Sequence, residues 1–351
     1  MRETARRALI ASTIFVGVIA LALALWKIKL LIALLFFGFI MAAAMRPGVE
    51  FLHTRLRVPR VAGILVHYAG LLGIVALLLY FVVPIAQKQI AAAVPTSRSE
   101  LNRAANHSTG IKHAILRGIQ KRLKKLPSAG KIANSALDVG LRAFEIFIGI
   151  FFIFASAAYW IFERKRAERV VLSLVPRRHR VVVRDTWELI DLKLGAFVRG
   201  QLLLVALVAT VLSFAFWIVG LRFWLLVGAF AGLVELIPVV GPLAAGAVAI
   251  GVGFADSWQK ALAAGLVVLA VRLLEDYVVV PKVLGDAVGL TPLTVLLSVA
   301  VVTFIFGGFA VILAIPIVAV LVTVLDVVVF NKDPAEEDVP TVLFPAKEVE
   351  T

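Results

Sequence analysis

The sequence predicts an all-α, polytopic integral membrane protein of about eight spans, with discontinuous helices in its C-terminal half and a small helical extracytoplasmic segment. Of its 351 residues, 62% are hydrophobic, and the mean hydropathy is +1.01. An ordinary soluble domain is only about 45–50% apolar. The apolar residues also gather in blocks of about twenty, which is long enough for a helix to cross a hydrocarbon layer of roughly 30 Å.

Charge and cysteine content narrow the class of protein further. The formal net charge is +14, and the basic residues cluster beside the apolar blocks. This pattern is typical of membrane orientation and of contact with anionic lipid. No basic patch is interleaved with aromatic residues, so nucleic acid is not an expected partner. Cysteine is absent, which excludes disulfides, thiolate nucleophiles and cysteine metal sites.

The standard motifs of catalysis and cofactor binding are missing from the sequence. It contains no Walker A loop, no H-E-x-x-H and no G-x-S-x-G. Its histidines are scattered and do not have the spacing of metal ligands. We therefore expect no catalytic residues, no cofactor and no metal site.

The N-terminal part, residues 1–83, holds three apolar blocks, at 8–26, 28–45 and 61–83. The first lacks a small-residue cleavage site before the next block, which indicates a retained span rather than a signal peptide. The link "WKIK" is so short that it predicts an antiparallel hairpin of the first two blocks. The polar sequence "RPGVEFLHTRLRVPR" then predicts a turn-rich loop before the third.

Residues 84–140 interrupt the apolar pattern with a polar, basic segment that is too long for a tight turn. Within it, Ser97 and Glu100 fit a capping box at a helix start. An apolar stripe at helical spacing follows, and basic residues fill much of the rest. Two interpretations stay open: a small helical cap on the membrane domain, or a helix lying on anionic lipid. The stripe consists of Ile111, Ile115, Ile119, Leu123 and Leu126.

Residues 141–330 hold the other five blocks. The block at 141–162 ends at the densest basic cluster of the chain, "ERKRAERVVLSLVPRRHRVVVRD", after which we expect an amphipathic helix over 182–197. The remaining apolar blocks lie at 198–219, 223–254, 258–280 and 293–330.

The last block is too long to be a single straight span. It would extend almost 60 Å at about 1.5 Å per residue, roughly twice the hydrocarbon thickness. The candidate break points are "FGGF", with Gly307 and Gly308, and "IPI", with Pro316. The tail at 331–351 is polar, acidic and proline-containing, which predicts disorder.

Basic loops predict the orientation of the spans. The N-terminal arginines, the loop before the third block and the basic cluster after the fourth should share the cytoplasmic side. An even number of spans then places both termini in the cytoplasm of a bacterial inner membrane. Residues 84–140 fall on the outer side, which the rule allows because long loops cross the membrane largely regardless of their charge.

The sequence "LVELIPVVGPLAAG" places a carboxylate and helix-breaking residues inside an apolar block. Proline leaves a carbonyl without its helical partner, so Pro238 and Pro242, with Gly241 between them, should open or bend the helix. Discontinuous helices of this kind build substrate and ion sites in transporters. Glu235, just before the break, is therefore a site candidate, although a boundary residue that reaches the interface would look the same.

A second charged group lies in "VRLLEDYVVVPKVLG". Arg272 lies three residues before Glu275 and four before Asp276, so the charges can pair on one helix face. They form either a neutralised contact between helices or a coupling site beside a pathway. Pro281 and Gly285 should end this helix.

Two further polar positions and one packing motif complete the candidates. Arg199 and Gln201, at the start of the fifth span, form either an interfacial anchor or a polar gate. The motif "GAFAG", with Gly228 and Gly232, fits the G-x-x-x-G pattern and predicts a close helix contact.

Three stretches together resemble the autoinducer-2 exporter-like family of permeases: "FVRGQLLLVAL", "LVELIPVVGPLAAG" and the long run that begins "LEDYVVVPKVLGDAVGLTPL". The resemblance covers nearly the whole chain, although the N-terminal half matches only in layout. It implies an eight-span membrane protein that forms homo-oligomers. The positions that fall on family motifs are Gln201, Pro238, Gly241, Pro242, Glu275, Asp276, Pro281, Gly285 and Pro292.

The expected function is a secondary transporter that works by alternating access, because no energy-coupling domain is visible. The resemblance implies export of a small signalling molecule or metabolite, or antiport of sodium or protons. Glu275 or Asp276 would carry the coupling proton or cation. The alternative is a non-transporting scaffold that recruits a partner or anionic lipid through residues 84–140.

Overall fold

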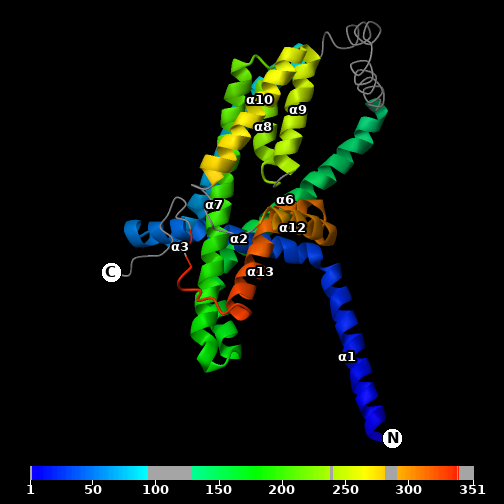
Figure 1. The fold of residues 1–351 in the computed structure, drawn as a ribbon, viewed down its shortest axis with the longest axis vertical. Helices are drawn as coiled ribbons and strands as arrows, with labels where there is room; N and C mark the ends of the chain where they lie inside the picture. The colour runs from blue at the N-terminus through cyan, green and yellow to red at the C-terminus, as the bar shows by residue number, and fades with distance from the viewer. Residues whose placement is uncertain (1, 94–128, 238–239, 281–290, 338, 340–351) are drawn as a thin grey trace. The chain divides into compact units, whose positions relative to one another are not determined.

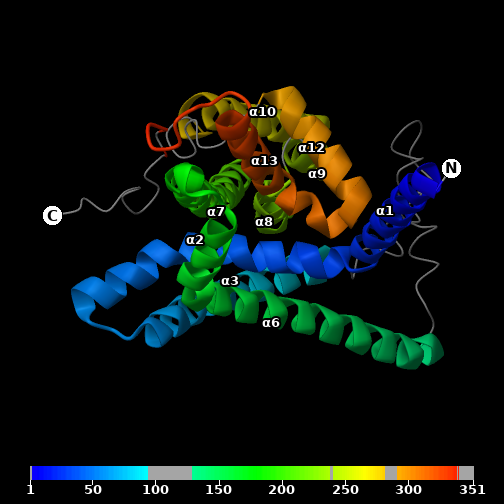
Figure 2. The same cartoon turned by 90° about the horizontal axis from the view of Figure 1, so that it is seen from below.

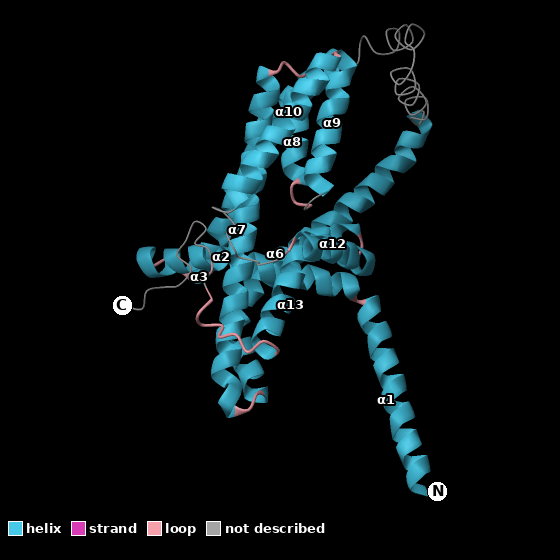
Figure 3. Ribbon diagram, viewed as in Figure 1, coloured by secondary structure: helices cyan, strands magenta, loops and turns pink. Residues whose placement is uncertain are grey.

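The computed structural model describes residues 2–93, 129–237, 240–280, 291–337 and 339, and every regular element within them is helical (Figures 1 and 3). The prediction of an all-α polytopic membrane protein is thereby confirmed. The chain divides into two compact units. Unit 1 comprises Met1–Pro47, Phe151–Gly200 and Val283–Thr351, and unit 2 comprises Gly48–Ile150 and Gln201–Lys282.

Helices α1 (Arg2–Lys27) and α2 (Lys29–Leu56) do not form the expected hairpin. The backbone hydrogen bonds continue across the junction, from Ile28 N to Ala24 O and from Ile32 N to Ile28 O. The two helices therefore leave Ile28 at an open angle, as Figures 1 and 2 show. The prediction was wrong because "WKIK" contains no glycine or proline that would end a helix.

Helix α2 also runs through most of the segment that we expected to be a loop. Pro47 lies inside it, and the helix ends at Leu56. Arg57 adopts a left-handed conformation with φ 53° and Pro59 follows, which is a common way to end a helix. Helix α3 (Arg60–Ala93) begins directly afterwards.

Two long helices form the middle of the chain. Helix α6 (Ala129–Leu174) and helix α7 (Arg180–Ile218) are joined by the short 3₁₀ turn η1 (Arg177–His179). The amphipathic helix and the fifth apolar block, expected as two elements, are thus one continuous helix. Its first part buries Leu189, Leu194 and Phe197.

The sixth block is broken, as its prolines and glycine predict. It consists of α8 (Trp224–Val234) and α9 (Val240–Asp256), which pack against each other as a hairpin. At 11 and 17 residues, these helices are about 16 and 25 Å long, short of the roughly 30 Å of a membrane core. Helix α10 (Trp258–Leu274) packs on α9 and continues into one π-helical turn, η2 (Glu275–Val279) (Figure 1).

The last block is broken too. Helix α12 (Pro292–Phe306) ends at Gly307, whose φ of 97° suits glycine. A 3₁₀ segment, η3 (Gly308–Leu313), leads into α13 (Ala314–Val328). The break therefore lies at "FGGF", whereas Pro316 sits in the first turn of α13, where proline is tolerated.

Five helical segments of the described chain are long and apolar enough to cross a membrane, and they fall in five of the eight expected blocks. Shorter apolar helices, which include α8 and α9, lie in others. The capping box at Ser97 and the apolar stripe from Ile111 to Leu126 lie outside the described residues, as does the tail from residue 340 onward.

Helices α7 and α8 approach closely in unit 2, as "GAFAG" predicts. A Cβ atom at Gly228 would meet Ser213, and one at Gly232 would lie 2.5 Å from the Cβ of Ala209. The neighbouring core buries Val208, Leu212, Phe216 and other apolar residues.

We expect Gly228→Leu to force α8 away from α7, because the new side chain has no space beside Ser213. Overpacking of this kind costs about 1–3 kcal/mol. A thermal unfolding scan of the detergent-solubilised protein would measure it. Gly251→Leu is the matched control, since a Cβ there meets nothing within 4 Å, and equal losses from both variants would contradict the packing role of Gly228.

Candidate functional site

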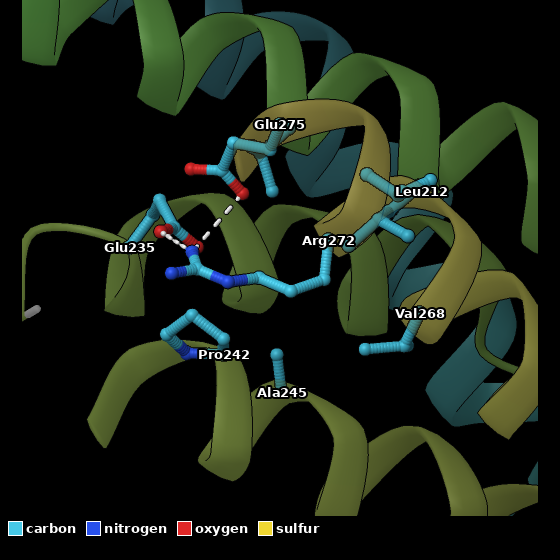
Figure 4. A pocket seen from close by; sticks show the side chains of 9 residues that line it. Leu212, Glu235, Pro242, Ala245, Val268, Arg272 and Glu275 are labelled. Atoms are coloured by element: carbon cyan, nitrogen blue, oxygen red, sulfur yellow. Dashed lines mark hydrogen bonds and ion pairs between the residues drawn. The ribbon is translucent and has the colours of Figure 1, made fainter. Parts of the chain in front are cut away.

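The centre of the candidate site is Arg272, at the end of α10, which contacts three carboxylates of unit 2. Figure 4 shows two of them, Glu235 and Glu275. Its Nη1 lies 3.4 Å from Glu235 Oε1 and 3.3 Å from Glu275 Oε2. Its Nη2 lies 2.9 Å from Asp276 Oδ1. The expected pairs within α10 and η2 are therefore present, and Glu235 joins them from the end of α8.

Burial separates the three carboxylates into two kinds. The side chains of Glu235 and Glu275 are 7% and 5% exposed, whereas that of Asp276 is 43% exposed. The Glu235 side chain therefore lies inside unit 2 rather than on its surface. Asp276 is thus only partly enclosed by unit 2, in contrast to the two glutamates.

A π-helical turn begins at Glu275, the last residue of the α10 face that lines the buried cluster. Glu275 is the first residue of η2, where the α-helix widens by one residue per turn. Single π turns of this kind often occur at functional sites because they redirect side chains without ending the helix.

The broken backbone of the sixth block is held in place next to this cluster. Gln201 Nε2, on α7, donates to the carbonyl oxygen of Glu235 at 3.0 Å. Gly241 donates its N–H to Ile237 O at 2.8 Å, and a Cβ atom at Gly241 would collide with the carbonyl of Val234. The carbonyls that the break frees are thus partly satisfied by protein, as a bilayer interior requires.

A small pocket opens beside the charged cluster and is otherwise apolar. It leaves room for about one water molecule. The side chains drawn in Figure 4 come from several helices and surround Arg272. The lining consists of Val208, Leu212, Glu235, Pro242, Ala245, Val268, Val271, Arg272 and Glu275.

The sequence missed the apolar wall of this pocket, although a signal for it existed. Val268, Val271, Arg272 and Glu275 have the spacing i, i+3, i+4 and i+7, which places them on one helix face. The link from Glu235 to Arg272 was also missed, because it depends on how α8 and α10 each pack against α9.

The other predicted site residues lie elsewhere. Arg199 belongs to unit 1, where its guanidinium donates to Ala44 O at 3.2 Å. Pro292 begins α12, and Gly307, Gly308 and Pro316 belong to the break in unit 1. Pro238, Pro281 and Gly285 lie outside the described residues.

A separate charged cluster in unit 1 was not anticipated. Asp191, 3% exposed on α7, accepts hydrogen bonds through Oδ2 from Arg46 and from Arg164. It therefore fixes α2, α6 and α7 together within this unit. The expected amphipathic helix over 182–197 contained the residue, but its burial could not be read from spacing alone.

We expect Gln201→Leu to loosen the broken helix, because the carbonyl of Glu235 then loses its side-chain donor. An unsatisfied buried carbonyl costs about 1–3 kcal/mol. Hydrogen–deuterium exchange of the α8–α9 hairpin would measure the change, with Thr210→Val, which removes an exposed hydroxyl elsewhere on α7, as the control. Unchanged exchange in the leucine variant would contradict a positioning role for Gln201.

Comparison with known proteins gives a consistent result. Residues 14–330 match the family model described as "AI-2E family transporter". "Putative transport protein YueF" of Bacillus subtilis (strain 168) is 31% identical over 163 residues, 46% of this chain but only 44% of that protein. "Putative transport protein YrrI" of the same organism is 24% identical over 292 residues, 78% of this chain and 80% of that protein.

Proposed function

We propose that this chain, which belongs to the AI-2E family of transporters, is a secondary transporter driven by proton antiport. Its membrane-spanning helices and its family indicate membrane transport. The proposed cargo is a small signalling molecule or metabolite that leaves the cell while protons enter.

The observation that carries the proposal is an excess of buried negative charge. Glu235 and Glu275 are both buried and share one guanidinium, that of Arg272. Burying an ion that lacks a full partner costs several kcal/mol, on the order of the stability of a whole domain. A bound proton or cation removes that cost, and its release creates a charged state that favours another conformation.

A proton suits the dimensions of the site better than a larger ion. The pocket has room for about one water molecule, and Arg272 Nη1 already occupies the position between the two carboxylates. A metal cation needs several oxygen ligands around it, whereas a proton needs one carboxylate oxygen. Arg272 would then pair with whichever carboxylate is ionised.

The proposal includes an orientation in the membrane. The turn between α6 and α7 exposes Arg177, Arg178 and His179, which favours the cytoplasmic side of a bacterial inner membrane. Both termini would share that side. Contact with anionic lipid at these arginines and assembly into homo-oligomers are part of the same proposal.

Transport by purified protein in liposomes tests the proposal. Liposomes with an acidic interior are clamped at zero membrane potential and given external autoinducer-2, which serves as the transport probe. The concentration of the probe inside the liposomes and the internal pH are measured together. We expect probe accumulation with a rise of internal pH, and a protonophore should abolish both. Accumulation driven only by a sodium gradient would contradict proton coupling, and no accumulation under either gradient would contradict antiport of this probe.

A further inference from the structure

Lys193, on the first part of α7, is a buried cation outside the candidate site. Its side chain is 7% exposed. Its Nζ lies 2.6 Å from Glu337 Oε1 and 3.4 Å from the hydroxyl oxygen of Thr323 on α13. Thr323 is 1% exposed, so the ammonium group is held between two helices of unit 1. Lysine is almost never buried without a partner, because an unpaired ammonium in a dry interior is strongly disfavoured.

The carboxylate that pairs with Lys193 comes from beyond the last helix. Residues 331–337, which we name the C-terminal strap, turn back after α13. Asn331 is left-handed with φ 52°, and the Nζ of Lys332 lies 3.0 Å from Asp326 Oδ2. Asp333 then forms a turn by accepting the N–H of Ala335 on its side chain at 2.9 Å.

Packing, in addition to charge, holds the strap in place. Pro334 is buried, although it lies in a segment that is otherwise exposed and polar. Four features therefore hold the strap: a left-handed turn, a surface ion pair, a buried proline and an ion pair with a buried lysine.

We propose that the C-terminal strap is a latch, in which Glu337 clamps α7 to α13 through Lys193 and must be released for the transporter to change conformation. α13 is the second half of the broken last block, and α7 is the helix that carries Gln201. Both are elements that alternating access would have to move. The regulatory part of this proposal rests on the proposed transport function.

The two ends of the ion pair are unequal, as a reversible latch requires. The Glu337 side chain is 35% exposed, so it can leave into water at little cost, whereas Lys193 is nearly fully buried. Once Glu337 has left, Lys193 lacks its carboxylate. The arrangement in which α7 and α13 enclose the Lys193 ammonium is then disfavoured, because the charge is buried without a partner. This penalty is relieved when the two helices separate enough for water to reach the ammonium.

Hydrogen–deuterium exchange tests the latch without any transport substrate. In the closed strap, the Lys332 amide donates to Asp326 O of α13, and the amides of Ala335 and Glu336 donate to Asp333. In Glu337→Gln, we expect the peptide that covers residues 331–337 to exchange about tenfold faster, the factor that loss of one charge-assisted hydrogen bond implies. Lys193→Met should have the same effect, and the double variant should exchange no faster than either single one. Glu336→Gln, the exposed neighbour, is the matched control.

Transport tests the regulatory part. Glu337→Gln should transport autoinducer-2 faster than wild type in the acid-interior liposomes, while Glu336→Gln should not. Equal exchange in Glu337→Gln and Glu336→Gln would overturn the latch, whatever the transport result. Faster exchange with an unchanged transport rate would overturn the regulatory role and leave the strap a structural contact. If the wild type shows no transport, the proposed function fails, and the exchange result still decides whether the strap opens.

Discussion

Changing both buried carboxylates, Glu235→Gln with Glu275→Gln, is expected to uncouple the transporter from the proton gradient. Glutamine keeps the size and the hydrogen-bonding ability of glutamate but cannot bind and release a proton. Accumulation of autoinducer-2 driven by an acidic interior should fall to the level of protein-free liposomes. Without a proton gradient, the variant should still exchange labelled for unlabelled autoinducer-2 across the liposome membrane, because this exchange needs no net movement of protons.

The matched control for this experiment is Asp276→Asn. Asp276 also pairs with Arg272, but its side chain is 43% exposed, so it adds little to the charge buried within unit 2. It should retain most of the gradient-driven accumulation. Wild-type accumulation in the double glutamine variant would contradict the assignment of Glu235 and Glu275 as the coupling site. Equal losses of accumulation in the double glutamine variant and in Asp276→Asn would show that pairing with Arg272, rather than buried charge, is what matters.

Arg272→Met is expected to have the largest effect on stability in unit 2. It leaves Glu235 and Glu275 buried near each other without their shared cation. Removing one partner of a buried ion pair costs about 3–5 kcal/mol. The free energy of unfolding in mixed micelles, measured by denaturant titration, would give the loss. Adding both glutamine substitutions should restore most of it, since no charge then remains buried.

Arg222→Met is the control for this stability measurement. Arg222 is exposed, also in unit 2, and most surface substitutions change stability by less than about 0.5 kcal/mol. A loss in Arg272→Met that the two glutamine substitutions do not relieve would contradict the charge explanation. The loss would then reflect the packing of the arginine stem against the pocket.

The sequence predicted local features of the fold well, because these depend on neighbouring residues. The break between α8 and α9 follows from Gly241 and the prolines beside it. Pairing of Arg272 with Glu275 and Asp276 follows from helical spacing. The contact of Gly228 with α7 follows from the small-residue motif. Each of these features requires only a few consecutive residues and the helical period.

Features that join distant parts of the chain could not be predicted in the same way. Glu235 meets Arg272 because α8 and α10 both pack against α9, and nothing in either segment encodes that approach. The pairing of Glu337 with Lys193 could not be predicted either, because the polar composition of the tail indicates disorder. The failed hairpin at Ile28 has a different cause, since a short link was read as a turn although it contains no helix-breaking residue.

The π turn at Glu275–Val279 determines the directions in which side chains point from the helix axis near the charged cluster. Successive residues of an α-helix are offset by about 100° around the axis, and a π turn inserts one residue more than an α turn would hold. Residues before the bulge and residues after it therefore follow two different azimuths. Glu275 lies where these two directions meet. If the π turn moved along the helix by one residue, the Glu275 carboxylate would rotate away from the Arg272 guanidinium, and no helical turn would have to unfold.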